Sequence, residues 1–163
     1  MESDFKEAKI LYKEGKLDEA SKICKKILKK EKKNIQSLHL LALIALQSNK
    51  YNETIELINK SIELKSNEPS FYFIKGLALY ELELFDQSIK NFNKAIEIKS
   101  DYTEVLLNLG NAQKTIGLFN EALKNYNKAI ELQPSYAEAH NNIGLVLHEL
   151  KDFESAIKSY NRA

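Results

Sequence analysis

The sequence is poor in the residues that mark disulfide-linked, secreted or membrane proteins. Its 163 residues include one cysteine, so no internal disulfide can form. No stretch comes near the roughly 18 consecutive apolar residues that indicate a membrane helix, and the N-terminus has no apolar run of the signal-peptide type. We therefore expect neither secretion nor membrane spanning, and we predict a cytoplasmic protein with no membrane partner.

The sequence motifs of enzyme active sites are also missing. There is no GxxxxGK phosphate loop, no GxSxG nucleophile elbow, no Cys-x-x-Cys pair and no His-Glu-x-x-His zinc motif. The five glycines are accounted for by helix contacts and turns. We expect no catalytic residues, no cofactor and no enzymatic activity.

Charge of either sign is in little excess. The 24 lysines and arginines nearly balance the 23 acidic residues, and the formal net charge is +1. This balance argues against a general affinity for nucleic acid or anionic membranes. A lysine run extends from Lys22 to Lys33, but no aromatic residues interleave with it. We interpret the run as a solvated helix face, with an acidic partner at that end as the alternative.

What the sequence does contain is a repeat of 34 residues without insertion or deletion. Two columns of small residues and one of large apolar residues recur at this spacing. They are Ala8, Ala42, Gly76, Gly110 and Gly144; Ala20, Thr54, Ser88, Ala122 and Ala156; and Leu17, Tyr51, Phe85, Phe119 and Phe153. A period of this length with a helix-turn-helix pattern predicts a helical solenoid.

These columns resemble the tetratricopeptide repeat family over the whole chain. The family pattern is W-x2-L-G-x2-Y, then A-x3-F-x2-A and a late proline. Residues 103–136 match it through Leu106, Leu109, Gly110, Ala122, Tyr126, Ala129 and Pro134. The sequence departs from the pattern at Lys75 and Gln113, and it has no tryptophan. The resemblance implies an all-α fold, a right-handed superhelix of helix pairs, and a role in protein binding.

The period divides the chain into five predicted repeats in one array. They are residues 1–34, 35–68, 69–102, 103–136 and 137–163, of which the last is incomplete. Capping-box spacings at Asp4, Asp101 and Ser135 predict helix starts, and Pro69 suits a first helical turn.

The turn inside each repeat has its own column. It holds Gly15, Asn49 and Gly117, residues that tolerate the left-handed conformation common at helix ends. Glu83 occupies this position in the third repeat, where we expect a tightened or strained turn.

The two ends of the array differ. Asp4 and Glu7 occupy mostly apolar columns, which indicates the polar outer face of a capping repeat. At the other end, Phe153, Ile157 and Tyr160 have no following helix to cover them. We expect the chain to be the N-terminal part of a longer protein. A homo-oligomer formed through this end is the alternative.

The histidines and the cysteine fit packing better than chemistry. His140 shares its column with Leu38, Tyr72 and Leu106, and His148 has no second ligand at the i+4 spacing of a helical zinc site. His39 lies in another repeat. Cys24 occupies a position that is otherwise Ile, Phe or Tyr, as a small buried hydrophobe would. No metal site is predicted.

A second face of the first helix in each repeat is the predicted binding groove. In the proteins that this chain resembles, that face is concave and holds an extended peptide or a helix. Its predicted residues are apolar and aromatic toward the N-terminus and amide-rich toward the C-terminus: Phe5, Lys9, Tyr12, His39, Leu40, Leu43, Phe73, Ile74, Leu77, Tyr80, Asn108, Asn111, Asn141 and Asn142. Contiguous exposed apolar residues usually mark an interaction site. Burial of part of this stripe inside the superhelix, or its coverage by self-association, are the alternatives.

Asn108 and Asn142 share one column and resemble the asparagine ladder of nucleocytoplasmic sugar transferases, whose amides bind a peptide main chain. The same column begins with Lys6, Leu40 and Ile74, so the ladder has at most two rungs. The carboxylate clamp of co-chaperones is a poorer match.

The sequence supports three hypotheses on function. The first is a non-catalytic protein-interaction scaffold that binds a peptide or an amphipathic helix in its groove. The second is the N-terminal targeting arm of a larger enzyme, similar to a glycosyltransferase or sulfotransferase. The third is a structural protein that self-assembles through its uncovered C-terminal end. The repeat does not identify the protein partner.

Overall fold

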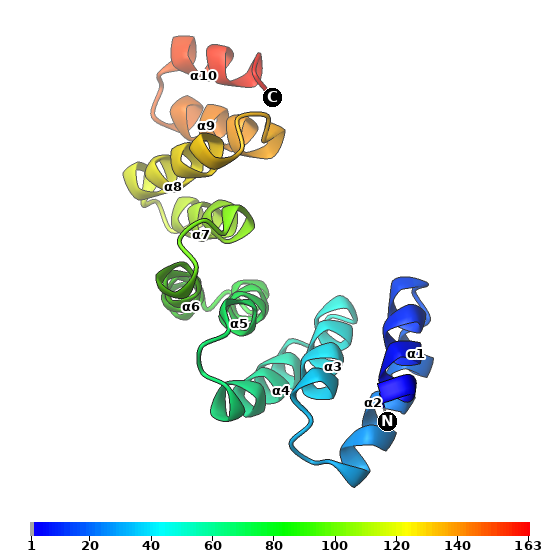
Figure 1. Cartoon of the computed structure of the whole chain (residues 1–163). Coiled ribbons are helices and arrows are strands. Elements are labelled where there is room, and N and C mark those ends of the chain that lie inside the picture. Colours follow the sequence, from blue (N-terminus) through cyan, green and yellow to red (C-terminus); the bar gives the residue numbers. More distant parts are fainter. Residues whose placement is uncertain (1) are drawn as a thin grey trace. The chain divides into compact units, whose positions relative to one another are not determined.

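The structure is a computed structural model that describes residues 2–163. Over these residues the chain is helical and contains no strand, as predicted (Figure 1). The helices are α1 (Glu2–Lys13), α2 (Leu17–Lys30), α3 (Ile35–Gln47), α4 (Tyr51–Leu64), α5 (Pro69–Glu81), α6 (Phe85–Ile98), α7 (Thr103–Thr115), α8 (Phe119–Leu132), α9 (Ala137–Glu149) and α10 (Phe153–Tyr160).

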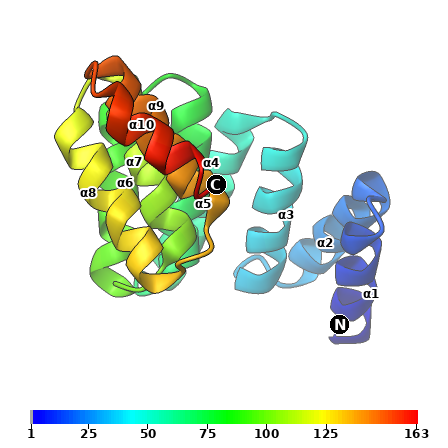
Figure 2. The ribbon, with the colours of Figure 1, turned by 90° about the horizontal axis from the view of Figure 1, so that it is seen from above.

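The helices form two compact units. The first unit ends at Leu82 and contains α1 to α5, and the second unit is Glu83–Ala163 and contains α6 to α10. Within each unit, consecutive helices pack against each other (Figures 1 and 2). Alternate helices are neighbours too: α1 contacts α3, α3 contacts α5, and α7 contacts α9. The prediction of a single array across both units stays a prediction.

Helix starts follow the 34-residue period of the sequence. The first helices of the later repeats begin at Ile35, Pro69, Thr103 and Ala137, and the second helices begin at Leu17, Tyr51, Phe85, Phe119 and Phe153. Both series have the same constant spacing. The sequence repeat is therefore also a repeat of secondary structure.

The turn between the two helices of each repeat uses the left-handed backbone region. The φ angle is 76° at Gly15, 57° at Asn49, 59° at Glu83, 80° at Gly117 and 63° at Lys151. The strain expected at Glu83 is thus present, and Lys151 shares it, although no strain was predicted there. A residue with a Cβ in this region costs about 1–2 kcal/mol.

The predicted capping boxes are wrong. Asp4 lies inside α1, and the residues that directly precede α7 and α9 are Tyr102 and Tyr136, whose side chains make no capping hydrogen bond. Asp101 and Ser135 lie one residue too early to cap these helices. Side-chain caps occur elsewhere: Asn34 Oδ1 accepts from Ser37 N at 3.0 Å, and Asp152 Oδ1 accepts from Ser155 N at 3.2 Å. The position of Pro69 in the first turn of α5 is confirmed.

The core of the first unit has an apolar cluster at each hairpin. Ala8, Ala20 and Cys24 join Leu40 in one cluster, and Ala42 joins Ile58, Phe71 and Ile74 in the next. Cys24 is fully buried, and burial raises the pKa of its thiol to about 11. This high pKa keeps the thiol protonated and unreactive near neutral pH, as expected for a small buried hydrophobe.

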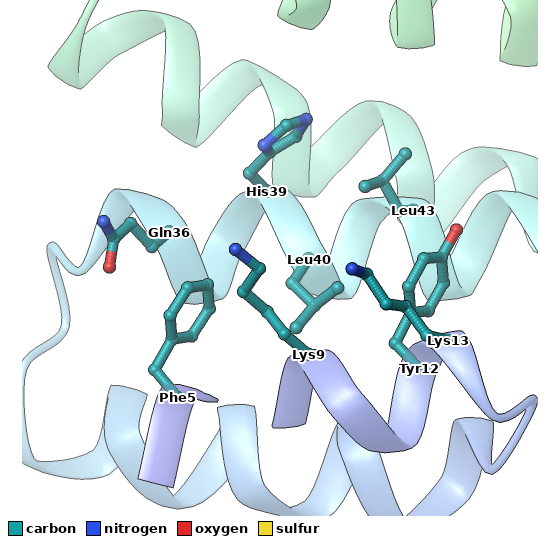
Figure 3. A pocket seen from close by; sticks show the side chains of 8 residues that line it. All are labelled: Phe5, Lys9, Tyr12, Lys13, Gln36, His39, Leu40 and Leu43. Atoms are coloured by element: carbon teal, nitrogen blue, oxygen red, sulfur yellow. The ribbon is translucent and has the colours of Figure 1, made fainter. Parts of the chain in front are cut away.

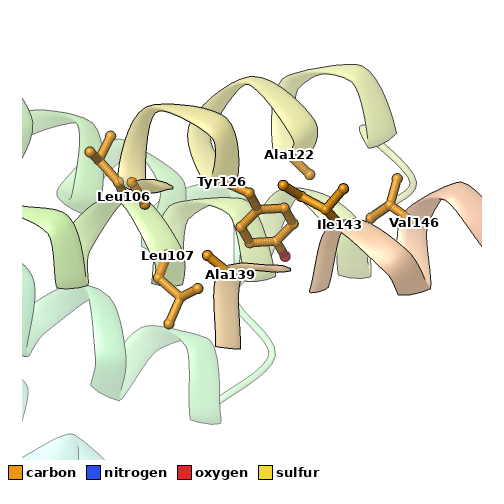
Figure 4. Close-up of a cluster of buried hydrophobic side chains, with 8 residues drawn as sticks. Leu106, Leu107, Ala122, Tyr126, Ala139, Ile143 and Val146 are labelled. Carbon is orange, nitrogen blue, oxygen red and sulfur yellow. The ribbon is translucent and has the colours of Figure 1, made fainter. Parts of the chain in front are cut away.

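The core of the second unit is centred on Tyr126. Its ring is fully buried among residues of α7, α8 and α9, which include Leu106, Ala122, Ala139, Ile143 and Val146 (Figure 4). The ring lies against Gly110, where an added Cβ would approach Tyr126 Cε1 to 2.5 Å. Gly110 therefore lets the two helices of this hairpin close onto an aromatic side chain.

The two departures from the family pattern have polar partners in the structure. Lys75 Nζ donates to Asn59 Oδ1 at 2.8 Å, and Gln113 Oε1 accepts from Asn125 Nδ2 at 2.7 Å. Each bond joins the first helix of one hairpin to a neighbouring second helix. The polar replacements are thus compensated by a hydrogen bond, which a buried polar group requires.

Candidate functional site

An apolar pocket lies between α1 and α3 in the first unit. It has a volume of about 400 Å³. Figure 3 shows the side chains of the two helices converging on this space. Its lining residues are Phe5, Lys9, Tyr12, Lys13, Gln36, His39, Leu40 and Leu43. Six of these belong to the groove predicted from the sequence, so the structure brings the N-terminal part of that set together.

The pocket has an apolar floor and a half-exposed wall. Leu40 is buried, with 5% of its surface exposed, and it belongs to the core cluster against which Phe5 and Tyr12 pack. Leu43 is half-buried and packs against the next cluster along the unit. Because the same side chains face both the core and the pocket, the walls are held in place before any ligand arrives.

His39 contributes an imidazole to the pocket wall. Its ring packs edge-on against Phe71, with ring centroids 5.1 Å apart. Burial lowers the pKa of His39, and the opposing influence of the Glu68 carboxylate is smaller. The imidazole is therefore mostly neutral at neutral pH.

The rest of the predicted apolar stripe is less open. Phe73 and Ile74 on α5 are buried, with 6% and 3% of their surfaces exposed. Ile74 packs in the cluster of Ala42. Leu77 and Tyr80 are half-buried, and Leu77 lines a small hollow with Leu46. The alternative that part of the stripe is packed inside the fold thus applies to Phe73 and Ile74.

The predicted amides are partly engaged within the second unit. Asn111 Oδ1 accepts two hydrogen bonds, from Tyr126 Oη at 2.8 Å and from Asn142 Nδ2 at 2.9 Å. Asn108 Nδ2 donates to the Glu104 carbonyl at 2.8 Å, as an intrahelical bond. Asn141 is exposed. The structure therefore joins Asn111 to Asn142 and leaves Asn108 and Asn141 outside this pair.

The remaining candidates for chemistry have structural surroundings. His140 is buried, and its Nε2 lies 3.0 Å from the Pro134 carbonyl oxygen. His148 packs against Phe153, with ring centroids 5.3 Å apart. Among residues 2–163, no three His, Cys, Asp or Glu side chains are grouped so that they could hold a metal ion. None of the helices over this range has the length and apolar character needed to span a membrane.

The C-terminal helix α10 carries an open apolar surface. Phe153 is 54% exposed, Ile157 60% and Tyr160 36%. The equivalent residues of α8, one period earlier, pack against α9: Phe119 and Leu123 lie at the edge of the cluster around Tyr126. Helix α9 thus covers this face of α8, whereas no helix of the described chain packs on the same face of α10.

Two features of the site were missed in the sequence. Lys13 and Gln36 line the pocket, and the signal for Lys13 was its place beside Lys9 and Tyr12 on one turn of the helix. The hydrogen bonds that join Asn111, Tyr126 and Asn142 had no signal, because the repeat aligns equivalent positions and says nothing of contacts between different columns.

Comparisons with known proteins agree on one family. A model described as "Anaphase-promoting complex, cyclosome, subunit 3" matches residues 7–95, which is more than half of the chain. A model described as "TPR repeat" matches residues 76–117 and 116–151. The chain belongs to the tetratricopeptide repeat family. No curated protein matches it.

Solved structures of similar fold cover nearly the whole chain. A crystal structure of MamA has 24% sequence identity and a TM-score of 0.88, over 95% of this chain and 91% of that chain. MamA from Desulfovibrio magneticus RS-1 has 16% identity and a TM-score of 0.91, over 99% and 91%. YrrB, described as a TPR protein with an unusual peptide-binding site, has 19% identity and a TM-score of 0.81, over 98% and 82%. At these identities the likeness shows the fold.

Proposed function

We propose that the protein is a non-catalytic interaction scaffold that binds a peptide or an amphipathic helix at the pocket between α1 and α3. The observation that carries this proposal is the pocket itself, an apolar concavity with a few polar groups at its rim. Phe5, Tyr12 and Leu43 supply apolar surface that a ligand side chain would cover. The peptide-binding site ascribed to YrrB supports the same class of ligand.

The second unit has amides of its own, and we propose separately that they bind the main chain of a peptide. Asn111 Nδ2 and Asn142 Oδ1 make no hydrogen bond within the described residues. The N–H groups of Asn111 Nδ2 and the acceptor oxygen of Asn142 thus remain for a peptide group. Asn108 and Asn141 would add further polar contacts of the same kind.

The test is selection of short random peptides displayed on phage against the immobilised protein, followed by affinity measurement for the selected peptides. Leu43→Glu places a charge in the pocket wall, and we expect it to abolish binding. Leu132→Glu on α8 is the matched control, because Leu132 is 44% exposed and lies in the other unit. Circular dichroism of both variants reports whether the fold is kept. Undiminished binding by a folded Leu43→Glu variant would contradict the proposal.

A second candidate function is self-assembly through the open surface of α10. The exposure of Phe153 and Ile157 favours it, because contiguous exposed apolar residues tend to be covered by another molecule. Sedimentation across a concentration series would show association, which Ile157→Glu should prevent. A monomer at every concentration would exclude this role. The hypothesis of a targeting arm of a larger enzyme stays a prediction from the family resemblance.

A further inference from the structure

The rim of the α1–α3 pocket carries two lysines that form no ion pair with any residue of 2–82. Lys9 and Lys13 line the pocket, are exposed, and form no ion pair within the described residues. They also line a second hollow on the outer side of α1, together with Lys6 and Ile10. The two unpaired ammonium groups therefore lie on the ridge between two concave surfaces.

The nearby acidic residues are engaged or face elsewhere. Glu2 forms an ion pair with Lys6 at 3.2 Å, and Glu14 with Lys16 at 2.8 Å. Asp4 and Glu7 precede Lys9 by five and two residues, so they lie about 140° and about 200° around the helix from it. On these grounds α1 offers no carboxylate to Lys9 or Lys13 on the pocket side.

The opposite wall of the pocket adds no negative charge. Helix α3 contains no Asp, Glu, Lys or Arg, and its contributions to the pocket are Gln36, His39, Leu40 and Leu43. Glu68 lies close enough to influence His39, but its carboxylate is held by Lys65 at 2.9 Å and by Ser70 at 3.2 Å. The pocket thus combines an apolar floor with a rim that is cationic on one side and uncharged on the other.

We infer that the pocket selects an acidic–apolar peptide segment, in which a large apolar side chain is flanked by Asp or Glu. The inference rests on the proposed function and names the ligand chemistry of the same site. The apolar side chain would enter against Leu40 and between Phe5, Tyr12 and Leu43. The flanking carboxylates would meet Lys9 and Lys13, which gives the charge complementarity that favours one class of partner over others.

The size of the electrostatic effect is limited by solvent. Ion pairs at exposed positions each contribute little, so the apolar contact supplies most of the affinity and the lysines supply the selectivity. We expect a Glu-flanked peptide to bind about tenfold more tightly than the same peptide with Lys at those positions. The difference should shrink in concentrated salt, because mobile ions screen exposed charges.

The experiment uses the full chain and two kinds of probe. The first is the phage-displayed random peptide library, from which wild-type protein should select apolar residues flanked by Asp or Glu. The second is a set of three synthetic peptides that share one selected apolar residue and carry Glu, Gln or Lys at the flanking positions. Binding is measured by fluorescence anisotropy at low and at high salt.

The protein variants assign the effect to the rim. Lys9→Glu combined with Lys13→Glu should reverse the order, so that the Lys peptide binds better than the Glu peptide. Lys22→Glu combined with Lys26→Glu on α2 makes the same change in net charge at exposed positions outside the pocket, and it should leave the order unchanged.

The outcomes separate this inference from the proposed function. Equal affinity for the three peptides, together with loss of binding in Leu43→Glu, would overturn the acidic selectivity and leave the groove in place. If the order of affinities for the three peptides changes equally in both double-lysine variants, Lys9 and Lys13 at the rim are not the cause of the selectivity. Failure to select any peptide would count against the inference and the proposed function alike.

Discussion

The two units close their helix hairpins with opposite combinations of side-chain size. In the first unit, alanine is paired with a residue of small or medium size: Ala8 lies in one cluster with Cys24, and Ala42 with Ile58. In the second unit, glycine faces a phenol ring, since Gly110 meets Tyr126 and Gly144 meets Tyr160. Between the Ala42–Ile58 and Gly110–Tyr126 pairs, a smaller residue on the first helix is matched by a larger residue on the second, as close packing requires.

This difference is linked to the polar character of each unit. Cys24 ends in a weakly polar thiol and Ile58 in a methyl group, so neither offers a hydroxyl group, and the pocket between α1 and α3 in the same unit has an apolar floor. Tyr126 fills its hairpin and also places a hydroxyl beside Asn111, which in turn binds Asn142. One repeat position therefore controls both the spacing of a hairpin and the hydrogen-bonding groups at the surface that we propose for ligand binding.

Gly110→Ala is the most direct test of the glycine–tyrosine contact that distinguishes the second unit from the first. The new Cβ would lie 2.5 Å from the ring of Tyr126, which is fully buried and cannot move aside. Overpacking of this kind costs about 1–3 kcal/mol, against a gain of about 1 kcal/mol in helix propensity. We expect a net loss of up to about 2 kcal/mol in the free energy of unfolding, measured by urea denaturation.

Gly110→Ala combined with Tyr126→Ile recreates the Ala42–Ile58 pair of the first unit, and it should recover part of the lost stability. Gly144→Ala should cost less than Gly110→Ala, because Tyr160 is 36% exposed and can shift. A Gly110→Ala variant more stable than the wild type would show that helix propensity outweighs the contact.

Tyr126→Phe removes the hydroxyl group that bonds to Asn111 and keeps the aromatic ring. The Asn111 amide oxygen would lose the hydroxyl donor at 2.8 Å and keep only the bond from Asn142. A loss of about 1 kcal/mol in the free energy of unfolding is expected. If the variant is as stable as the wild type, the hydroxyl contributes nothing to the unit. Tyr72→Phe is a control, since its hydroxyl donates to a backbone carbonyl at an exposed site in the first unit.

Lys151→Gly tests the left-handed turn residue, a feature that both units contain. The turn of α1 and α2 uses Gly15 at the left-handed position, whereas the turn of α9 and α10 uses Lys151. Glycine relieves the Cβ strain but adds freedom to the unfolded chain, so we expect a gain of less than about 1 kcal/mol. Gly15→Ala should destabilise by about 1 kcal/mol in the same thermal or urea assay. A loss of stability in Lys151→Gly would mean that the Lys151 side chain has a role beyond the turn.

The smallest expected effect concerns His39 and the pH dependence of stability. Burial lowers its pKa in the folded state, so the folded state favours the neutral ring. The contribution of the neutral His39 ring to the free energy of unfolding is complete above the unfolded-state pKa of about 6.5. It is lost as the pH falls from there toward the lower pKa of the folded state. As the pH is lowered from about 7.5 to about 5, the urea midpoint should fall more steeply for the wild type than for His39→Gln. Parallel curves would exclude a role for His39.

The sequence predicted the helices and their period well, because the same steric and packing demands recur at every 34th residue. Helix starts at Thr103 and Ala137 were misplaced, since a capping pattern does not reveal which residue has the backbone geometry of a cap. At the site, a helical wheel was enough to group Phe5, Lys9 and Tyr12.

The wheel did not reveal the burial of Leu40, Phe73 and Ile74, because it treats one helix alone and contains no neighbouring helix that could bury them. For the same reason the wheel did not reveal the hydrogen bond between Asn111 and Asn142. Their bond joins α7 to α9, and a comparison of columns cannot show which side chains from different helices meet.

The reciprocal sizes at the hairpin contacts limit how the chain can be cut and rejoined. A hairpin moved or deleted as a whole keeps its own pair of contact residues, such as Ala42 with Ile58 or Gly110 with Tyr126. Excision of residues 51–118 would preserve the 34-residue register but join α3 to α8, and would set the Ala42 methyl group against the Tyr126 ring. The interchangeable module of this protein is therefore the complete hairpin, and a splice inside it would give a chain of correct period with a mismatched contact.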